Sequence, residues 1–170
     1  MTLTYAEEMR TLAEIAIALA GFSGVVMALK ARQDLSDRKV DYARLRELLI
    51  TSLVVVFFAF LPSMAAGVLG DSPWVWRGPQ LLFGIVHVGA MALFMVTAGS
   101  EVTSASLWEL ATVPLALLVI VLQFATAFGF FSDYLAASYL LALLWFLLIA
   151  AMNFSVLLLQ EVPVRKGGQG

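Results

Sequence analysis

Five apolar stretches, each long enough to cross a lipid bilayer, dominate this sequence. They cover approximately residues 11–29, 48–69, 80–98, 111–131 and 138–159. A spanning helix needs about 20 apolar residues, and a helix satisfies its own backbone hydrogen bonds in lipid. Of the 170 residues, 62% are hydrophobic and only 13% are charged. The pattern therefore predicts an all-α protein, a polytopic transmembrane helix bundle of five spans with no soluble domain.

We expect one transmembrane helical domain over residues 1–162, including a basic loop at 30–47, followed by a flexible glycine-rich tail at 163–170. A cleaved signal peptide begins with a positively charged region. Here Glu7 and Glu8 occupy that region, and Glu14 interrupts the apolar run. The first stretch is therefore predicted to be a retained span.

Basic residues predict the orientation, because Lys and Arg are retained on the cytoplasmic side of membranes. Two groups stand out, one in the loop and one in the tail: Lys30, Arg32, Arg38, Lys39, Arg44 and Arg46, then Arg165 and Lys166. Five spans place both groups on one side, whereas four spans would separate them. The connection at 99–110 is an exception, since it carries two glutamates and no basic residue. We predict the N-terminus outside and the C-terminus in the cytoplasm of a bacterial inner membrane.

A few polar side chains interrupt the apolar stretches. Ionisable groups in lipid cost several kcal/mol unless they are paired or hydrated. Counting 1.5 Å per residue places Glu14 about 9 Å, His87 about 3 Å and Gln123 about 4–5 Å outward of the midplane. We therefore predict a polar cluster in the outer half of the bundle, a possible proton or solute path, formed by Glu14, Ser63, His87, Gln123 and Thr126.

A structural interpretation of the same residues stays open. Arg10 lies four residues before Glu14, the spacing at which two side chains meet on a helix surface. A neutral His87 could serve only to hydrogen-bond Gln123 and fix the packing of two helices.

Two further features concern helix packing. Small residues recur every fourth position in the first span, at Ala16, Ala20, Gly24 and Ala28. Such a ladder lets another helix approach closely, either within the chain or from a second copy. Pro62 and Pro114 free backbone carbonyls inside their helices, and these carbonyls must find other donors in lipid.

Residues 36–47 are predicted to extend the second span as a charged helix. Its arginines can meet anionic lipid headgroups, or the loop at 30–47 can dock a cytoplasmic or membrane partner. The net charge of −2 argues against a nucleic-acid partner. With no cysteine and one histidine, the chain cannot supply a structural zinc site or a bis-histidine haem site alone. We expect neither metal nor cofactor.

Gly21-Phe22-Ser23-Gly24 resembles the GxSG motif of rhomboid intramembrane proteases, with His87 following two spans later. The resemblance implies a serine nucleophile at Ser23 and a histidine base at His87. Ser23 is expected in the inner half of the bilayer and His87 in the outer half, so the two are not placed for proton transfer. An intramembrane protease therefore remains a remote hypothesis, and we otherwise expect no enzyme.

The segment 20–26, Ala-Gly-Phe-Ser-Gly-Val-Val, precedes a charged loop and the sequence Arg-Leu-Arg-Glu-Leu-Leu at 44–49. Together they resemble small multi-pass bacterial inner-membrane proteins to which no activity is assigned. The resemblance implies a location in a bacterial inner membrane and does not imply an activity. Two hypotheses follow: a homo-oligomeric channel or small-ion or solute permeation protein, and a non-catalytic membrane subunit, scaffold or regulatory partner of a larger complex.

Overall fold

A computed structural model describes residues 5–30, 38–98 and 107–159. The elements in chain order are α1 (Ala6–Lys30), α2 (Arg38–Leu69), α3 (Trp74–Ala98), α4 (Leu107–Ala127), a 3-10 turn η1 (Ser132–Tyr134) and α5 (Leu135–Leu159). The described parts of the chain contain no strand. The predicted all-α class is confirmed, and each predicted apolar stretch corresponds to one helix.

Four helical segments are long and apolar enough to cross a membrane: Ala6–Ala28, Leu45–Leu69, Trp74–Val96 and Ser132–Leu158. The remaining helix, α4, has 21 residues. Its apolar part among the described side chains, Thr112–Ala127, is shorter than the other four. The composition and length of these helices are those of a membrane-associated helical protein.

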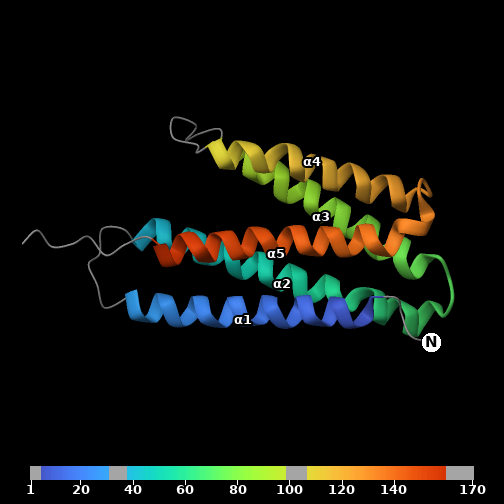
Figure 1. Ribbon diagram of the computed structural model, residues 1–170, viewed down its shortest axis with the longest axis horizontal. Helices are drawn as coiled ribbons and strands as arrows, with labels where there is room; N and C mark the ends of the chain where they lie inside the picture. Colours follow the sequence, from blue (N-terminus) through green and yellow to red (C-terminus); the bar gives the residue numbers. More distant parts are fainter. Residues whose placement is uncertain (1–4, 31–37, 99–106, 160–170) are drawn as a thin grey trace, which may run out of the picture.

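Successive helices run in opposite directions (Figure 1). The start of α1, the α2–α3 turn and the α4–α5 turn lie at one end, and the end of α1, the start of α2 and the end of α5 lie at the other (Figure 1). Helix α1 packs on α2 and α5, and the α3–α4 pair packs on the other side of these two helices. The α3–α4 pair diverges from α5 toward the end of the bundle where α2 begins (Figure 1).

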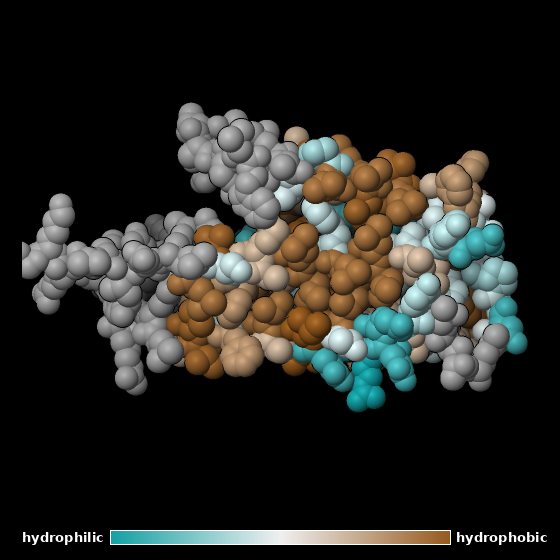
Figure 2. Space-filling model, viewed as in Figure 1, coloured by the Kyte–Doolittle hydropathy of each residue, from teal (hydrophilic) through white to brown (hydrophobic). Residues whose placement is uncertain are grey.

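An aromatic group holds the centre of the bundle together. Phe58 of α2 stacks on Phe83 of α3 with ring centroids 4.3 Å apart, and Phe83 contacts Tyr139 and Phe146 of α5 at 5.7 and 5.0 Å. Around this core the surface is mostly apolar, as the brown region of Figure 2 shows. An exposed apolar surface of this extent marks contact with lipid or with other proteins.

Pro62 of α2 illustrates how the bundle compensates a broken helix bond. A proline has no N–H, so the carbonyl four residues earlier, that of Phe58, loses its helical donor. The hydroxyl of Tyr139 donates to this Phe58 carbonyl at 2.6 Å from the neighbouring helix α5. The predicted need for another donor is thereby confirmed at Pro62.

The fourth predicted stretch extends too far, to residue 131, because α4 ends at Ala127. The amide of Phe130 donates to the carbonyl of Ala125 at 2.9 Å, and the amide of Gly129 to that of Thr126 at 3.1 Å. Gly129 adopts a φ of 100°. This pair of bonds around a left-handed glycine is the usual way to close a helix C-terminus, and it turns the chain into η1.

Candidate functional site

Buried polar side chains gather where α3, α4 and α5 meet. Each is at most 4% exposed, and the set comprises Gln80, His87, Gln123, Thr126 and Ser138, named here the polar cluster. Gln80 and His87 lie two helical turns apart, so they share one face of α3. The cluster therefore joins all three helices through one contiguous face.

His87 and Gln123 form the part of the cluster that lies farther from the end of the bundle with the α2–α3 and α4–α5 turns. The Nδ1 atom of His87 lies 2.9 Å from the Oε1 atom of Gln123, within hydrogen-bond distance. The edge of the histidine ring also meets Phe146, with centroids 4.9 Å apart and planes at 76°. An imidazole held on two sides in this way has a fixed orientation.

Gln80 forms the second part, nearer the end of the bundle that carries the turns into α3 and α5. Its Nε2 donates to Ser138 Oγ at 2.9 Å and to Thr126 Oγ1 at 3.2 Å. The two hydroxyls lie 2.9 Å from each other. The Gln80 side chain of α3 thereby hydrogen-bonds both to the end of α4 and to the start of α5.

Two polar atoms of the cluster have no hydrogen-bond partner in the described structure. These are the acceptor Oε1 of Gln80 and the donor Nε2 of Gln123, while Ser52 Oγ and Trp145 Nε1 are unpaired elsewhere in the bundle. A buried polar atom without a partner costs free energy. The cluster thus retains one free acceptor and one free donor, which suit water or a small polar molecule.

The structure brings together three of the five predicted members, His87, Gln123 and Thr126, and separates the other two. Ser63 is exposed on α2. The Glu14 carboxylate accepts from Arg10 Nε at 3.0 Å, and both side chains are exposed, at 61% and 76%. Among the described residues, no Cα atom of α1 lies within 8 Å of a Cα atom of α3 or α4. Glu14 therefore forms the surface pair that the alternative interpretation described.

Two members of the cluster were missed by sequence reasoning, Gln80 and Ser138. Both lie at the start of a predicted apolar stretch, where polar residues normally mark the boundary. One signal was available, because Gln80 precedes His87 by two helical turns and must lie on the same face. No local signal points to Ser138, since its role depends on how α5 packs against α4.

The small-residue ladder of α1 turns from the inside of the bundle to the outside. Ala16 is fully buried, Ala20 is half-buried, and Gly24 and Ala28 are exposed. A four-residue step advances about 40° beyond a full turn, so the ladder winds around the helix. A Cβ atom added at Gly21 or Gly24 would meet nothing within 4 Å. Among the described residues, nothing of the same chain therefore packs closely against this end of the ladder.

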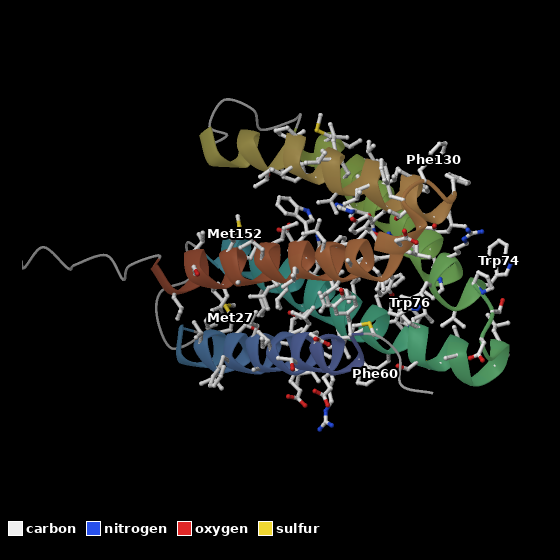
Figure 3. All side chains as sticks on the ribbon, turned by 45° about the vertical axis from the view of Figure 1, so that its right-hand side comes forward. Met27, Phe60, Trp74, Trp76, Phe130 and Met152 are labelled. Carbon is white, nitrogen blue, oxygen red and sulfur yellow. The ribbon has the colours of Figure 1, made fainter. Side chains whose placement is uncertain are left out.

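The exposed side of α1 forms one continuous stripe, named here the α1 outer face. It runs from Arg10 and Glu14 through Ala18 and Gly21 to Ala28, all exposed. Hydrophilic residues form a teal patch beside the brown surface in Figure 2, and charged side chains of α1 point away from the other helices in Figure 3. The exposed Ile17 lies on this stripe between Glu14 and Gly21. The face therefore combines an ion pair and an isoleucine with small residues along one side of a candidate span.

Five basic residues of the predicted loop, Lys30, Arg32, Arg38, Lys39 and Arg44, have side chains outside the described part of the chain, as has the whole tail 163–170. Arg46 is described and is exposed.

The structure does not pair Ser23 with His87. The buried Ser23 hydroxyl donates to the Ala20 carbonyl of its own helix at 2.7 Å. In the described helices, no Cα atom of α1 lies within 8 Å of one in α3. The arrangement that the rhomboid resemblance implies is thus not assembled.

Within the described residues, no group of three or more His, Asp or Glu side chains could hold a metal ion. Comparisons with protein-family models, with curated proteins and with solved structures find no match to this chain. Functional inference therefore depends on the geometry of the polar cluster and of the α1 outer face.

Proposed function

We propose that this chain is a five-span bacterial inner-membrane protein, with the N-terminus outside and the C-terminus in the cytoplasm, that assembles into a homo-oligomer and lets small ions or solutes permeate between its copies. The basic loop follows α1 and the basic tail follows α5, and both helices end at the same end of the bundle (Figure 1). Helix α4 has 21 residues, or about 32 Å, which suffices for a fifth span.

The observation that carries this proposal is the exposed Arg10–Glu14 pair inside a candidate span. The candidate span Ala6–Ala28 opens with Glu7, Glu8 and Arg10, and its apolar stretch begins at residue 11, so Glu14 lies about 5 Å inside the apolar part. Charges in such a position are costly in lipid and normally face a bundle interior or a water-filled cavity. A hydrated path between copies, bordered by their α1 outer faces, provides that environment.

A path within a single copy has less support. The polar cluster is enclosed by α3, α4 and α5 and is largely occupied by its own hydrogen bonds. Glu14 is exposed on α1, and among the described residues no Cα atom of this helix lies within 8 Å of one in α3 or α4. We therefore assign the polar cluster a packing role and the permeation path to the α1 outer face.

The test is flux through purified protein in liposomes, with proton and potassium gradients followed by entrapped dyes. We expect flux in the wild type and at least a severalfold change in Glu14→Gln, because the variant removes the charge that borders the path. Glu8→Gln is the matched control, since Glu8 is exposed on α1 but lies off the outer face. Absence of flux under every gradient, or equal effects of the two variants, would contradict the proposal.

The second candidate is a non-catalytic subunit of a larger membrane complex. The open space at Gly21 and Gly24 favours it, because a close-packed helix of another protein would fill that space equally well. Gentle detergent extraction of a tagged chain distinguishes the two. Recovery of a stoichiometric second protein that is lost in Gly21→Ile supports the subunit, whereas recovery of the chain alone as an oligomer supports the first proposal.

A further inference from the structure

An apolar groove runs along the outside of the bundle between α2 and α3. It is a shallow groove that is largely open to the surroundings, with a volume of about 390 Å³. Its walls come entirely from apolar side chains: Ile50, Leu53, Val54, Phe57, Phe58, Leu82 and Val86. A groove of this composition accepts a hydrocarbon chain.

The groove has a firm floor. Phe58 stacks on Phe83 of α3 and is joined to α5 through the Tyr139 hydroxyl on its carbonyl. From Phe57 to Ile50 the wall extends about 10 Å toward the start of α2. The residues that line it from α3, Leu82 and Val86, lie about one helical turn apart, so the groove runs along α3 as well as along α2.

Two opposite charges lie beyond the Ile50 end of this groove. Arg46 and Glu47 are both exposed, and they lie at the start of the candidate span Leu45–Leu69. Arg46 precedes Ile50 by one turn on the same face, and Glu47 precedes Val54 by two turns. Helical side chains lean toward the N-terminus, so both charged groups extend away from the groove toward the level of lipid headgroups.

Neither charge is already neutralised within the part of the chain whose side chains are described. The ion pair found there joins Arg10 to Glu14, and neither Arg46 nor Glu47 has a hydrogen-bonded partner for its charged group. Among the described side chains, the groove mouth therefore presents one exposed cation and one exposed anion on adjacent residues.

We propose that this groove binds one acyl chain of a phospholipid whose headgroup carries a phosphate and a primary ammonium, as in phosphatidylethanolamine. Arg46 donates to the phosphate, and Glu47 accepts from the ammonium. A phosphatidylcholine ammonium has no N–H to donate, and phosphatidylglycerol brings no cation for Glu47. The adjacent opposite charges thus select the amine headgroup, while the apolar walls hold the chain. This inference does not depend on permeation.

The experiment measures lipid retained by the purified chain after exchange into micelles containing dioleoyl phosphatidylethanolamine, phosphatidylcholine or phosphatidylglycerol. We expect preferential retention of phosphatidylethanolamine and the largest rise in Tm with this lipid. Arg46→Gln should lower its retention roughly tenfold, the fold-change for losing one hydrogen bond to a charged group. Glu47→Gln should reduce it to the phosphatidylcholine level and leave phosphatidylglycerol retention undiminished.

Two further variants complete the design. Leu53→Trp fills the groove and should lower retention of all three lipids, since Leu53 is an exposed wall residue. Arg77→Gln, at the opposite end of the bundle, is the control and should retain lipid as the wild type does. Equal retention of the amine and choline lipids by the wild type would overturn the proposal. An equal loss in Arg77→Gln and Arg46→Gln would also overturn it.

Discussion

The bond from Tyr139 to the Phe58 carbonyl makes a quantitative prediction about stability. Tyr139 is fully buried, and its hydroxyl lies 2.6 Å from an oxygen that Pro62 deprives of its helical donor. An unpaired buried polar group costs about 1–3 kcal/mol, while hydrogen bonds between membrane helices average about 0.6 and reach about 1.7 kcal/mol. We expect Tyr139→Phe to lower the free energy of unfolding by about 1.5 kcal/mol.

Restoring a backbone N–H donor for the Phe58 carbonyl tests this role of the Tyr139 hydroxyl. In Pro62→Ala, the new amide at position 62 can donate to the Phe58 carbonyl, whose two lone pairs also accept the Tyr139 hydroxyl. Tyr139→Phe should then cost about 0.5 kcal/mol, because the carbonyl keeps a partner. The double-mutant cycle should give a coupling energy of about 1 kcal/mol.

The assay is reversible unfolding from mixed micelles by a denaturing detergent, followed through the fluorescence of the four tryptophans. Tyr134→Phe is the control, since Tyr134 is 64% exposed and should change nothing measurable. Phenylalanine preserves the ring contacts of Tyr139 with Trp76 and Phe83. An equal cost of Tyr139→Phe with proline or alanine at position 62 would refute the role assigned to the freed carbonyl.

Two predictions concern glycines. Gly84→Ala should lower the free energy of unfolding by about 1–2 kcal/mol, because the new Cβ atom would lie 3.0 Å from the Phe124 ring. Gly89→Ala, where the added Cβ atom meets open space, is the control and should be neutral or stabilising in the same unfolding assay. Gly21→Ile should leave the unfolding free energy of the monomer unchanged but weaken self-association at least tenfold, measured by sedimentation in detergent. Gly67→Ile, also in open space, is the control and should change neither the unfolding nor the self-association. Unaltered self-association in Gly21→Ile would place the interface elsewhere.

The helices were predictable because a run of about 20 apolar residues marks each of them in the sequence. Helices α2, α3 and α5 end at residues 69, 98 and 159, as predicted from the polar and turn residues that follow. The charged helix predicted at 36–47 is confirmed, since α2 begins at Arg38. The apolar stretch predicted to start at residue 80 begins later than its helix, because α3 starts at Trp74. Polar residues continue a helix beyond an apolar run wherever they remain at its surface, so the start of hydrophobicity is not the start of the helix.

The rotation of each helix about its own axis was not predictable. Counting residues gives depth, and depth alone assigned Glu14 to the same cluster as His87. In a soluble protein the apolar face would identify the inside, but a helix in lipid is apolar on both sides. The exposed Ile17 and the buried Ala16 show this for α1. Which side of each helix points into the bundle is then decided by which helices are its neighbours. That is a property of the whole bundle.

Two kinds of contact hold the described bundle together, and they differ between its halves. The α3–α4–α5 side is joined by the hydrogen bonds of Gln80 and His87, whereas the α1–α2–α5 side places Ala16, Ala59 and Ala142 in its core. Between helices in lipid, close approach of small residues replaces the hydrophobic effect as the source of attraction. The α1 outer face offers small residues for this second kind of contact, and among the described residues nothing lies within 4 Å of a Cβ atom added at Gly21. In the proposed homo-oligomer, a second copy would supply that neighbour: its helix would fill the open space at Gly21, while the Arg10–Glu14 pairs of the copies would border the hydrated path.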